Sequence, residues 1–194
     1  MRKFSDKEVF EKLKTLKGFE KRSKDLPLIV GIQSKADLFN LFDDKFFVYD
    51  ENNNFIIGIS GTTNAGATGL KDFLKWNPKG TGVWKTNEFY KKCFQHGFTK
   101  GQECLRLVTQ IYHYRDNNKN DKVEEIGQLY KSNTLAHFHG IDFDESINIS
   151  KKVASKIGGY SVMCQVANIQ KDYAKVINFV KPYEYCDYVL LKEW

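Results

Sequence analysis

A β-hairpin is the feature that most constrains how this chain folds. The stretch KFFVYDENNNFIIGISGTT, residues 45–63, holds two runs of aromatic and β-branched residues around the polar segment 50–54. Two such runs separated by Asp, Glu and Asn pair as antiparallel strands. Further strand-like runs are LPLIVGIQS at 26–34, ECLRLVTQIYHYRD at 103–116, NTLAHFHGIDF at 133–143 and YCDYVLLKEW at 185–194. We therefore expect a domain dominated by antiparallel strands.

Two helices are predicted beside these strands. Residues 5–17 form an amphipathic pattern in which Ser5 is the N-cap, Glu8 completes a capping box and Gly18 ends the helix. A second helix over 168–181 has an apolar face. The inward residues of that face are Tyr173, Val176, Ile177 and Val180.

The glycine-rich segment 62–90 predicts a series of turns over a cleft. The sum of these elements is an α+β fold, mainly antiparallel sheet with a few flanking helices. A chain of 194 residues is long enough for one domain with a substantial core. We expect a basic helical segment at 1–24 followed by a single globular unit at 25–194.

Composition and charge limit the class of protein without selecting a function. Hydrophobic residues make up 41% of the chain and aromatic residues 14%, which indicates a folded globular protein. The net charge of +6, with seven lysines in the first 24 residues, favours anionic partners, although a solvated lysine face explains it more simply. No nucleic-acid-binding module is recognisable, so we expect no nucleic-acid partner.

The cysteines and the start of the chain give further limits. Four cysteines at positions 93, 104, 164 and 186 form no CxxC pair, which excludes a zinc ribbon and argues against a disulfide scaffold. No apolar run approaches the ~20 residues of a membrane span. The start, MRKFSDKEVFEKLK, lacks the apolar core of a secretory signal. We expect a protein made in the cytoplasm, with no transmembrane segment, that is exported by another route if it acts outside.

The strongest chemical signal is a His-x-His strand followed by a cysteine. His137 and His139 lie two apart in AHFHG, so on a strand both imidazoles point to the same face, and Gly140 lets the backbone turn directly afterwards. Cys164 follows in SKIGGYSVMCQV, residues 155–166. A thiol needs a nearby base or cation to become a thiolate at neutral pH, and an imidazole can supply it. A buried, inert Cys164 remains an alternative on these residues alone.

Metal binding is the other alternative. His-x-His is a common ligand spacing, and Asp142 or Cys164 can supply a third ligand, as in a zinc hydrolase. Residues 116–121, DNNKND, begin like a calcium loop but lack its glycine and its final glutamate. The glycine-rich GTTNAGATG, residues 61–69, lacks the Lys-Ser/Thr ending of a phosphate loop.

Over roughly residues 28–180 the chain resembles the L,D-transpeptidase catalytic domain (YkuD-like) family, in particular its compact phage and bacterial L,D-carboxypeptidase-like branch. HFHG is similar to the strand that carries the catalytic histidine of that family. GGYSVMCQV is similar to its nucleophile turn in Gly158, Ser161, Cys164, Gln165 and Val166, with Tyr160 where the branch prefers Trp. The segments SGTTNAG, NPKGTGVWKTNEFY and QIYHYRDNN also occur in the family's order. Two departures are Met163 in place of a glycine and a gap of 25 residues between His139 and Cys164.

The resemblance implies a sheet or sandwich of the transpeptidase type and a cysteine enzyme without cofactor or metal. Cys164 is then the nucleophile, His139 the base and acid, and the Gly140 carbonyl the group that orients His139. The backbone N–H groups of Cys164 and Met163 form the oxyanion hole. The remaining residues implied near the substrate are Ser161, Tyr160 and His137.

The implied substrate is a peptidoglycan stem peptide, cleaved through an acyl-enzyme by a carboxypeptidase or endopeptidase in the cell wall. The absence of a signal peptide and an anchor favours hydrolysis, as in a phage or prophage lysis or virion protein acting in the host envelope. The alternatives are a cross-linking transpeptidase, a degenerate wall-binding or virion structural protein, and a zinc hydrolase that uses His137 and His139. The oligomeric state stays open.

Overall fold

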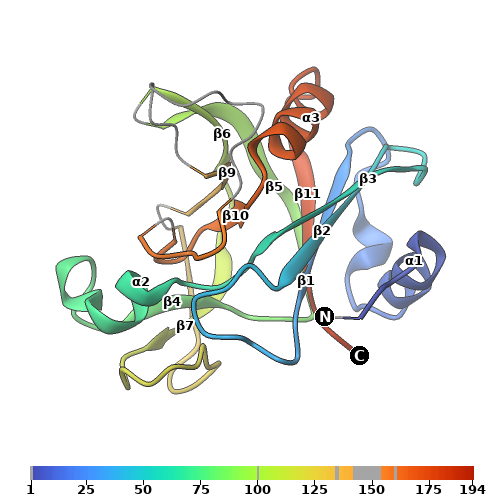
Figure 1. Ribbon diagram of the computed structural model, residues 1–194. Helices are drawn as coiled ribbons and strands as arrows, with labels where there is room; N and C mark the ends of the chain where they lie inside the picture. The colour runs from blue at the N-terminus through green and yellow to red at the C-terminus, as the bar shows by residue number, and fades with distance from the viewer. Residues whose placement is uncertain (1, 100, 134–135, 142–153, 160) are drawn as a thin grey trace.

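The computed structural model describes residues 2–99, 101–133, 136–141, 154–159 and 161–194. Within these residues the largest sheet closes into a barrel with the strand order β1-β11-β5-β6-β9-β10-β3-β2 (Figure 1). Its strands are β1 (Leu28–Gln33), β2 (Asp44–Tyr49), β3 (Phe55–Thr62), β5 (Glu88–Thr99), β6 (Gln102–Leu107), β9 (His137–Gly140), β10 (Gln165–Ala167) and β11 (Cys186–Lys192). The predicted mixed α+β fold, mostly strands, is confirmed, and the main sheet is a closed barrel.

A second sheet has the order β4-β7-β8. It contains β4 (Thr81–Trp84), β7 (Ile111–Asp116) and β8 (Tyr130–Ser132). The helices are α1 (Asp6–Lys14), α2 (Ala67–Lys71) and α3 (Gln170–Val180), with short 3₁₀ turns η1 (Phe19–Lys21) and η2 (Phe73–Lys75). No helix among the described residues is long and apolar enough to cross a bilayer.

Strand β1 is buried on both faces, which explains its nearly continuous apolar sequence. Ile29 belongs to the interior core of the barrel, whereas Leu28, Val30 and Ile32 belong to a second core under α1. β1 pairs in parallel with β11 and antiparallel with β2. The predicted hairpin is confirmed by the antiparallel pairing of β2 with β3.

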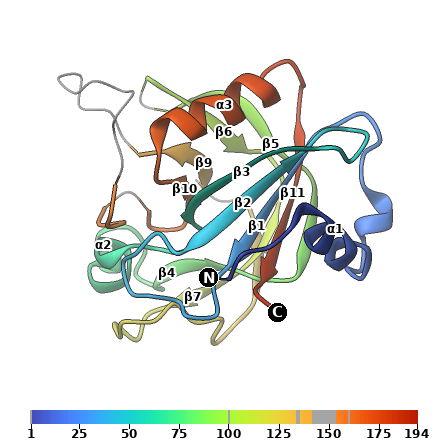
Figure 2. The same ribbon diagram turned by 45° about the vertical axis from the view of Figure 1, so that its right-hand side comes forward.

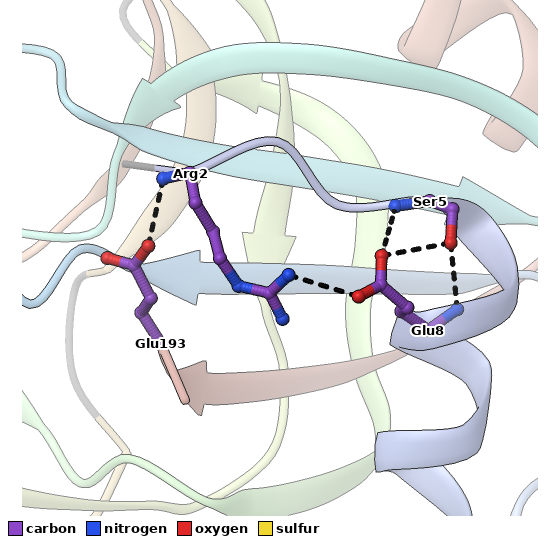
Figure 3. Close-up of polar contacts among 4 residues, drawn as sticks. All are labelled: Arg2, Ser5, Glu8 and Glu193. Carbon is purple, nitrogen blue, oxygen red and sulfur yellow. Dashed lines mark hydrogen bonds and ion pairs between the residues drawn. The ribbon is translucent and has the colours of Figure 1, made fainter.

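Helix α1 lies on the outside of the barrel, on the far side from α2 (Figure 2). Its capping box is present: Ser5 Oγ accepts from the Glu8 N–H at 3.2 Å, and Glu8 accepts from the Ser5 N–H at 2.9 Å (Figure 3). The Ser5 N–H and the Arg2 guanidinium lower the pKa of Glu8 to about 2. The Arg2 N–H also donates to Glu193 at 2.9 Å, so the two ends of the chain meet.

Three expectations about local structure need correction. The N-terminal helix ends at Lys14, before the predicted 17, and Gly18 instead begins η1 with a φ of 91°. The stretch 103–116 is two strands in different sheets: β6 belongs to the barrel and β7 to the second sheet. The segment 62–90 contains α2, η2, β4 and the start of β5 instead of turns alone.

Candidate active site

Strands β9 and β10 bring His139 and the region of Cys164 side by side. They pair in parallel, with Val166 opposite His139. Phe138 is buried in the barrel core, so His137 and His139 point to the outer face. The sequence predicted that they share one face. Cys164 directly precedes β10, two residues before Val166, and alternation therefore places it on the same outer face. Strand spacing and rise put the Cα atoms of His139 and Cys164 on the order of 8 Å apart.

The imidazole of His139 is held by the carbonyl of the next residue. Its Nδ1 lies 2.6 Å from the Gly140 carbonyl oxygen. Because a carbonyl only accepts, Nδ1 carries the proton and Nε2 of the neutral ring is left as the basic nitrogen. The contact that the sequence analysis expected between these two residues is thus present.

Gly140 is required at this position by the packing of α3. A Cβ atom on it would lie 2.2 Å from Gln170 Oε1 and 2.8 Å from the Tyr173 ring. The Tyr173 hydroxyl donates to the Phe138 carbonyl at 2.9 Å. Helix α3 therefore fixes the backbone that carries and orients His139.

His137 lies beside His139 and is neutral at pH 7. Burial lowers its pKa, and the neighbouring His139 and Arg106 lower it further. Its Nε2 lies 3.2 Å from Thr99 Oγ1, while its buried Nδ1 has no hydrogen-bond partner among the described residues. His137 therefore places no positive charge beside His139.

The turn before β10 is held by its carbonyl groups. Four consecutive carbonyl oxygens, those of residues 161 to 164, each accept a hydrogen bond. Their donors, in order, are the Gly66 N–H at 2.9 Å, Thr81 Oγ1 at 2.5 Å, Trp84 Nε1 at 2.9 Å and Ser161 Oγ at 2.8 Å. The turn is therefore fixed to β4 and to the start of α2 by residues distant in the sequence.

These contacts determine where the backbone N–H groups of Met163 and Cys164 point. In a trans peptide the N–H lies opposite the preceding C=O. Because the Val162 and Met163 carbonyls face Thr81 and Trp84 on β4, the two N–H groups point away from β4. Two adjacent N–H groups directed to one side of a nucleophile's turn can stabilise an oxyanion.

Met163 does not fill the space around the cysteine. Its side chain is 6% exposed and belongs to the barrel core. A Cβ atom on Gly82 would lie 2.2 Å from the Met163 sulfur, so the side chain occupies the space that this glycine leaves. Met163 has a negative φ, and the position does not demand a glycine.

Exposure separates Cys164 from the other three cysteines. Cys164 is partly exposed, whereas Cys93, Cys104 and Cys186 are buried. Burial raises the pKa of each of these three thiols. Of the four, Cys164 is the one that solvent can reach.

Other expected site residues are placed differently or lie outside the described residues. Ser161 is 1% exposed, and its hydroxyl shapes the turn through the Cys164 carbonyl. Tyr160 and Asp142 lie outside the described residues. Within the described part of the chain, no three His, Cys, Asp or Glu side chains group as metal ligands around His137 and His139.

The sequence analysis missed the residues that support the turn, above all Thr81, Gly82 and Trp84. The small residues and the tryptophan of TGVW, residues 81–84, indicate close packing against another segment. Nothing in the local sequence shows which segment that is. Comparison of the chain with family models, characterised proteins and solved structures finds no match.

Proposed function

We propose that the protein is a cysteine hydrolase of peptidoglycan stem peptides, of the L,D-transpeptidase type. Cys164 is the nucleophile, His139 the general base and acid, and the Gly140 carbonyl the group that orients the imidazole. The observation that carries the proposal is the fixed His139 tautomer on the strand next to the one that Cys164 precedes. The exposure of Cys164, against three buried cysteines, supports it.

The reaction proceeds in two steps. His139 Nε2 takes the thiol proton, and the Cys164 thiolate attacks the carbonyl carbon of a diamino-acid residue in the stem. The N–H groups of Met163 and Cys164 stabilise the oxyanion. His139 then protonates the departing amine, and a thioester remains on Cys164.

Water completes the cycle by attacking the thioester, with His139 as the base. We assign water as the acceptor because hydrolysis needs only one bound stem, whereas transpeptidation needs a second, oriented amine. Met163 suggested a degenerate wall-binding or virion protein as an alternative, and the burial of its side chain in the core supports the enzyme over that alternative. We also propose that the fold is of the L,D-transpeptidase type. His139 lies on β9 and Cys164 directly precedes the neighbouring β10 in a mostly antiparallel sheet, as the family resemblance implies.

The test is digestion of purified muropeptide monomers and cross-linked dimers, with products identified by mass. Wild-type protein should release amino acids or stem fragments, whereas Cys164→Ala should be inactive and His139→Gln slower by about 10²–10⁴-fold. His96→Gln is the matched histidine control, because His96 pairs with Glu103 on β5 and β6, away from the turn.

Three results decide the proposal. Equal activity of wild type and Cys164→Ala would remove the catalytic assignment. Products heavier than the substrates would show that the reaction is cross-linking and not hydrolysis. Loss of activity on dialysis against a chelator, with recovery on addition of zinc, would replace the cysteine mechanism by a metal one.

A further inference from the structure

A second candidate site lies on the β4-β7-β8 sheet. It is a pocket of about 470 Å³, a size suited to a small ligand or part of a larger one. It lies between the turn 77–80, the end of β7 and the chain that leads into β8. Its lining residues are Pro78, Lys79, Arg115, Asn117, Ile126, Gly127, Gln128 and Tyr130.

The pocket carries two cations and no acidic lining residue. Arg115 is half-buried, and burial lowers its pKa. Its guanidinium donates to the Gly80 carbonyl at 3.4 Å, and among the described residues neither Arg115 nor Lys79 forms an ion pair. A partly desolvated guanidinium without a carboxylate is a binding group for an anion.

The acidic residues next to the pocket are engaged elsewhere. Asp116 accepts from the backbone N–H groups of Asn118 and Glu124. The Glu124 carboxylate accepts from the side-chain amides of Asn118 and Asn120. These bonds hold the loop after β7, and neither carboxylate forms an ion pair with Arg115.

The turn that carries Lys79 is defined by its sequence, NPKG. The Gly80 N–H donates to the Asn77 carbonyl at 3.0 Å, and Lys79 lacks a positive φ, as in a type I turn with Pro78 at its second position. Lys79 Nζ lies 5.4 Å from the centre of the Tyr130 ring, which stacks on His113. The second cation is thus held at the rim by a rigid turn and an aromatic ring.

The pocket is connected to the cysteine turn through β4. Gly82 is the register partner of Arg115, and paired residues of an antiparallel ladder project to the same side of the sheet. That side of Gly82 contacts Met163, the neighbour of Cys164. Strand β4 therefore contacts both Arg115 of the pocket and the turn that carries Cys164.

We infer that this pocket binds a free carboxylate of a peptide. The identification of that peptide as a peptidoglycan stem rests on the proposed function. Arg115 holds the carboxylate through two parallel N–H donors, and Lys79 adds charge at the rim. Asn117 and Gln128 offer the donors and acceptors that peptide bonds need. An inorganic or polymer phosphate presents the same oxyanion chemistry, and the experiment separates the two sources.

Binding is measured by calorimetry with the full chain carrying Cys164→Ala, so that no turnover interferes. The probes are a stem-type tripeptide with a free glutamyl α-carboxylate, the same peptide with that carboxylate amidated, and inorganic phosphate. The acidic peptide should bind at least tenfold more tightly than its amide. Arg115→Gln should weaken it by about 10–100-fold, the range for a hydrogen bond to a charged group, and Lys79→Gln by only a few-fold.

Lys131→Gln is the matched control. It removes one positive charge from β8, where Lys131 lies over Tyr112 and outside the pocket, and it should leave the affinity unchanged. Arg115→Lys keeps the charge but lacks the planar guanidinium with its parallel N–H donors, and it should recover part of the affinity that Arg115→Gln loses. Thermal unfolding of each variant shows whether a loss of binding reflects a loss of folded protein.

The outcomes separate this inference from the proposed function. Equal affinity for the acidic and amidated peptides, or unchanged affinity in folded Arg115→Gln, overturns the carboxylate site even if wild-type protein cleaves muropeptides. Binding of phosphate with no binding of the acidic peptide would show that the pocket binds phosphate and not a peptide carboxylate. Arg115-dependent binding of the acidic peptide supports the site even if Cys164 proves not to be catalytic.

Discussion

Two walls of the barrel are stabilised in different ways. The covered wall, β1, β2 and β11 under α1, has six-residue pairing between β1 and β11 and an apolar core on each side. The site wall, β9 and β10 with residues 161–164, pairs over only three residues. Its turn is fixed instead by hydrogen bonds from Gly66, Thr81 and Trp84.

We expect the covered wall to contribute mainly to stability and the site wall mainly to function. Apolar burial on the covered wall is spread over many contacts and is non-directional. Hydrogen bonds on the site wall specify direction, which the proposed catalytic turn requires. Substitutions in the covered wall should therefore change the free energy of unfolding and leave the turnover of the folded protein unchanged.

The largest expected effect on stability is on the covered wall. Leu13 lies on the inner face of α1 and is fully buried, and Leu13→Ala should lower the free energy of unfolding by about 2–5 kcal/mol through lost burial and a cavity. Urea denaturation measures the loss, and Glu11→Ala on the exposed side of α1 is the control. Turnover per folded molecule should stay at the wild-type level. A fall in that turnover would show that the two walls are coupled.

A smaller effect with a specific rescue is expected where the site wall meets β4. Gly82→Ala places a methyl group against the Met163 sulfur and should cost about 1–3 kcal/mol through overpacking. Met163→Ala opens the space that the new methyl group needs. The double variant should therefore be more stable than the sum of the single changes predicts. Additive costs in urea denaturation would contradict the contact.

A pH dependence of stability should come from Asp44. Its hydrogen bonds hold the chain that leads to Gly66, which donates to the turn of the site wall. Asp44 is fully buried and accepts from Ser34 and Thr63, three residues before Gly66. Burial raises its pKa from 3.8 to about 7. Because the folded pKa is the higher one, this stability is fully present below pH 3.8 and is lost as the pH rises through 7.

The slope of that loss between the two pKa values should approach about 1.4 kcal/mol per pH unit. The measurement is the free energy of unfolding of wild type and Asp44→Asn across this range. The difference between the two proteins should change with pH, although the variant is less stable overall because its amide meets the Thr63 N–H. A constant difference would show that Asp44 keeps an ordinary pKa.

The smallest effect is expected at the capping box. Ser5→Ala removes the side-chain acceptor for the Glu8 N–H and should cost about 1 kcal/mol. Thermal unfolding compares it with Lys7→Ala, an exposed change in the same helix. Muropeptide cleavage should be unaffected, because α1 lies on the covered wall. A cost equal to that of the control would mean that tertiary packing alone holds α1.

The sequence predicted the elements that depend on neighbouring residues. The capping box of α1, the β2–β3 hairpin and the buried face of α3 all follow from local patterns, and all are present. That His137 and His139 share one face follows from strand alternation, whereas the structure shows that this face is the outer one. The candidate nucleophile and base were also named from sequence, and their roles stay a prediction.

Tertiary structure decided what depends on residues far apart. The stretch 103–116 gave no sign of its division between two sheets, and no pattern showed that the main sheet closes into a barrel. The sequence marked Met163 as a departure at the nucleophile turn, but only packing against Gly82 shows that its side chain lies in the core. The hydrogen bond from Trp84 to Met163 joins positions 79 residues apart. Sequence patterns record the preferences of adjacent residues, whereas such contacts form only when the whole barrel brings distant segments together.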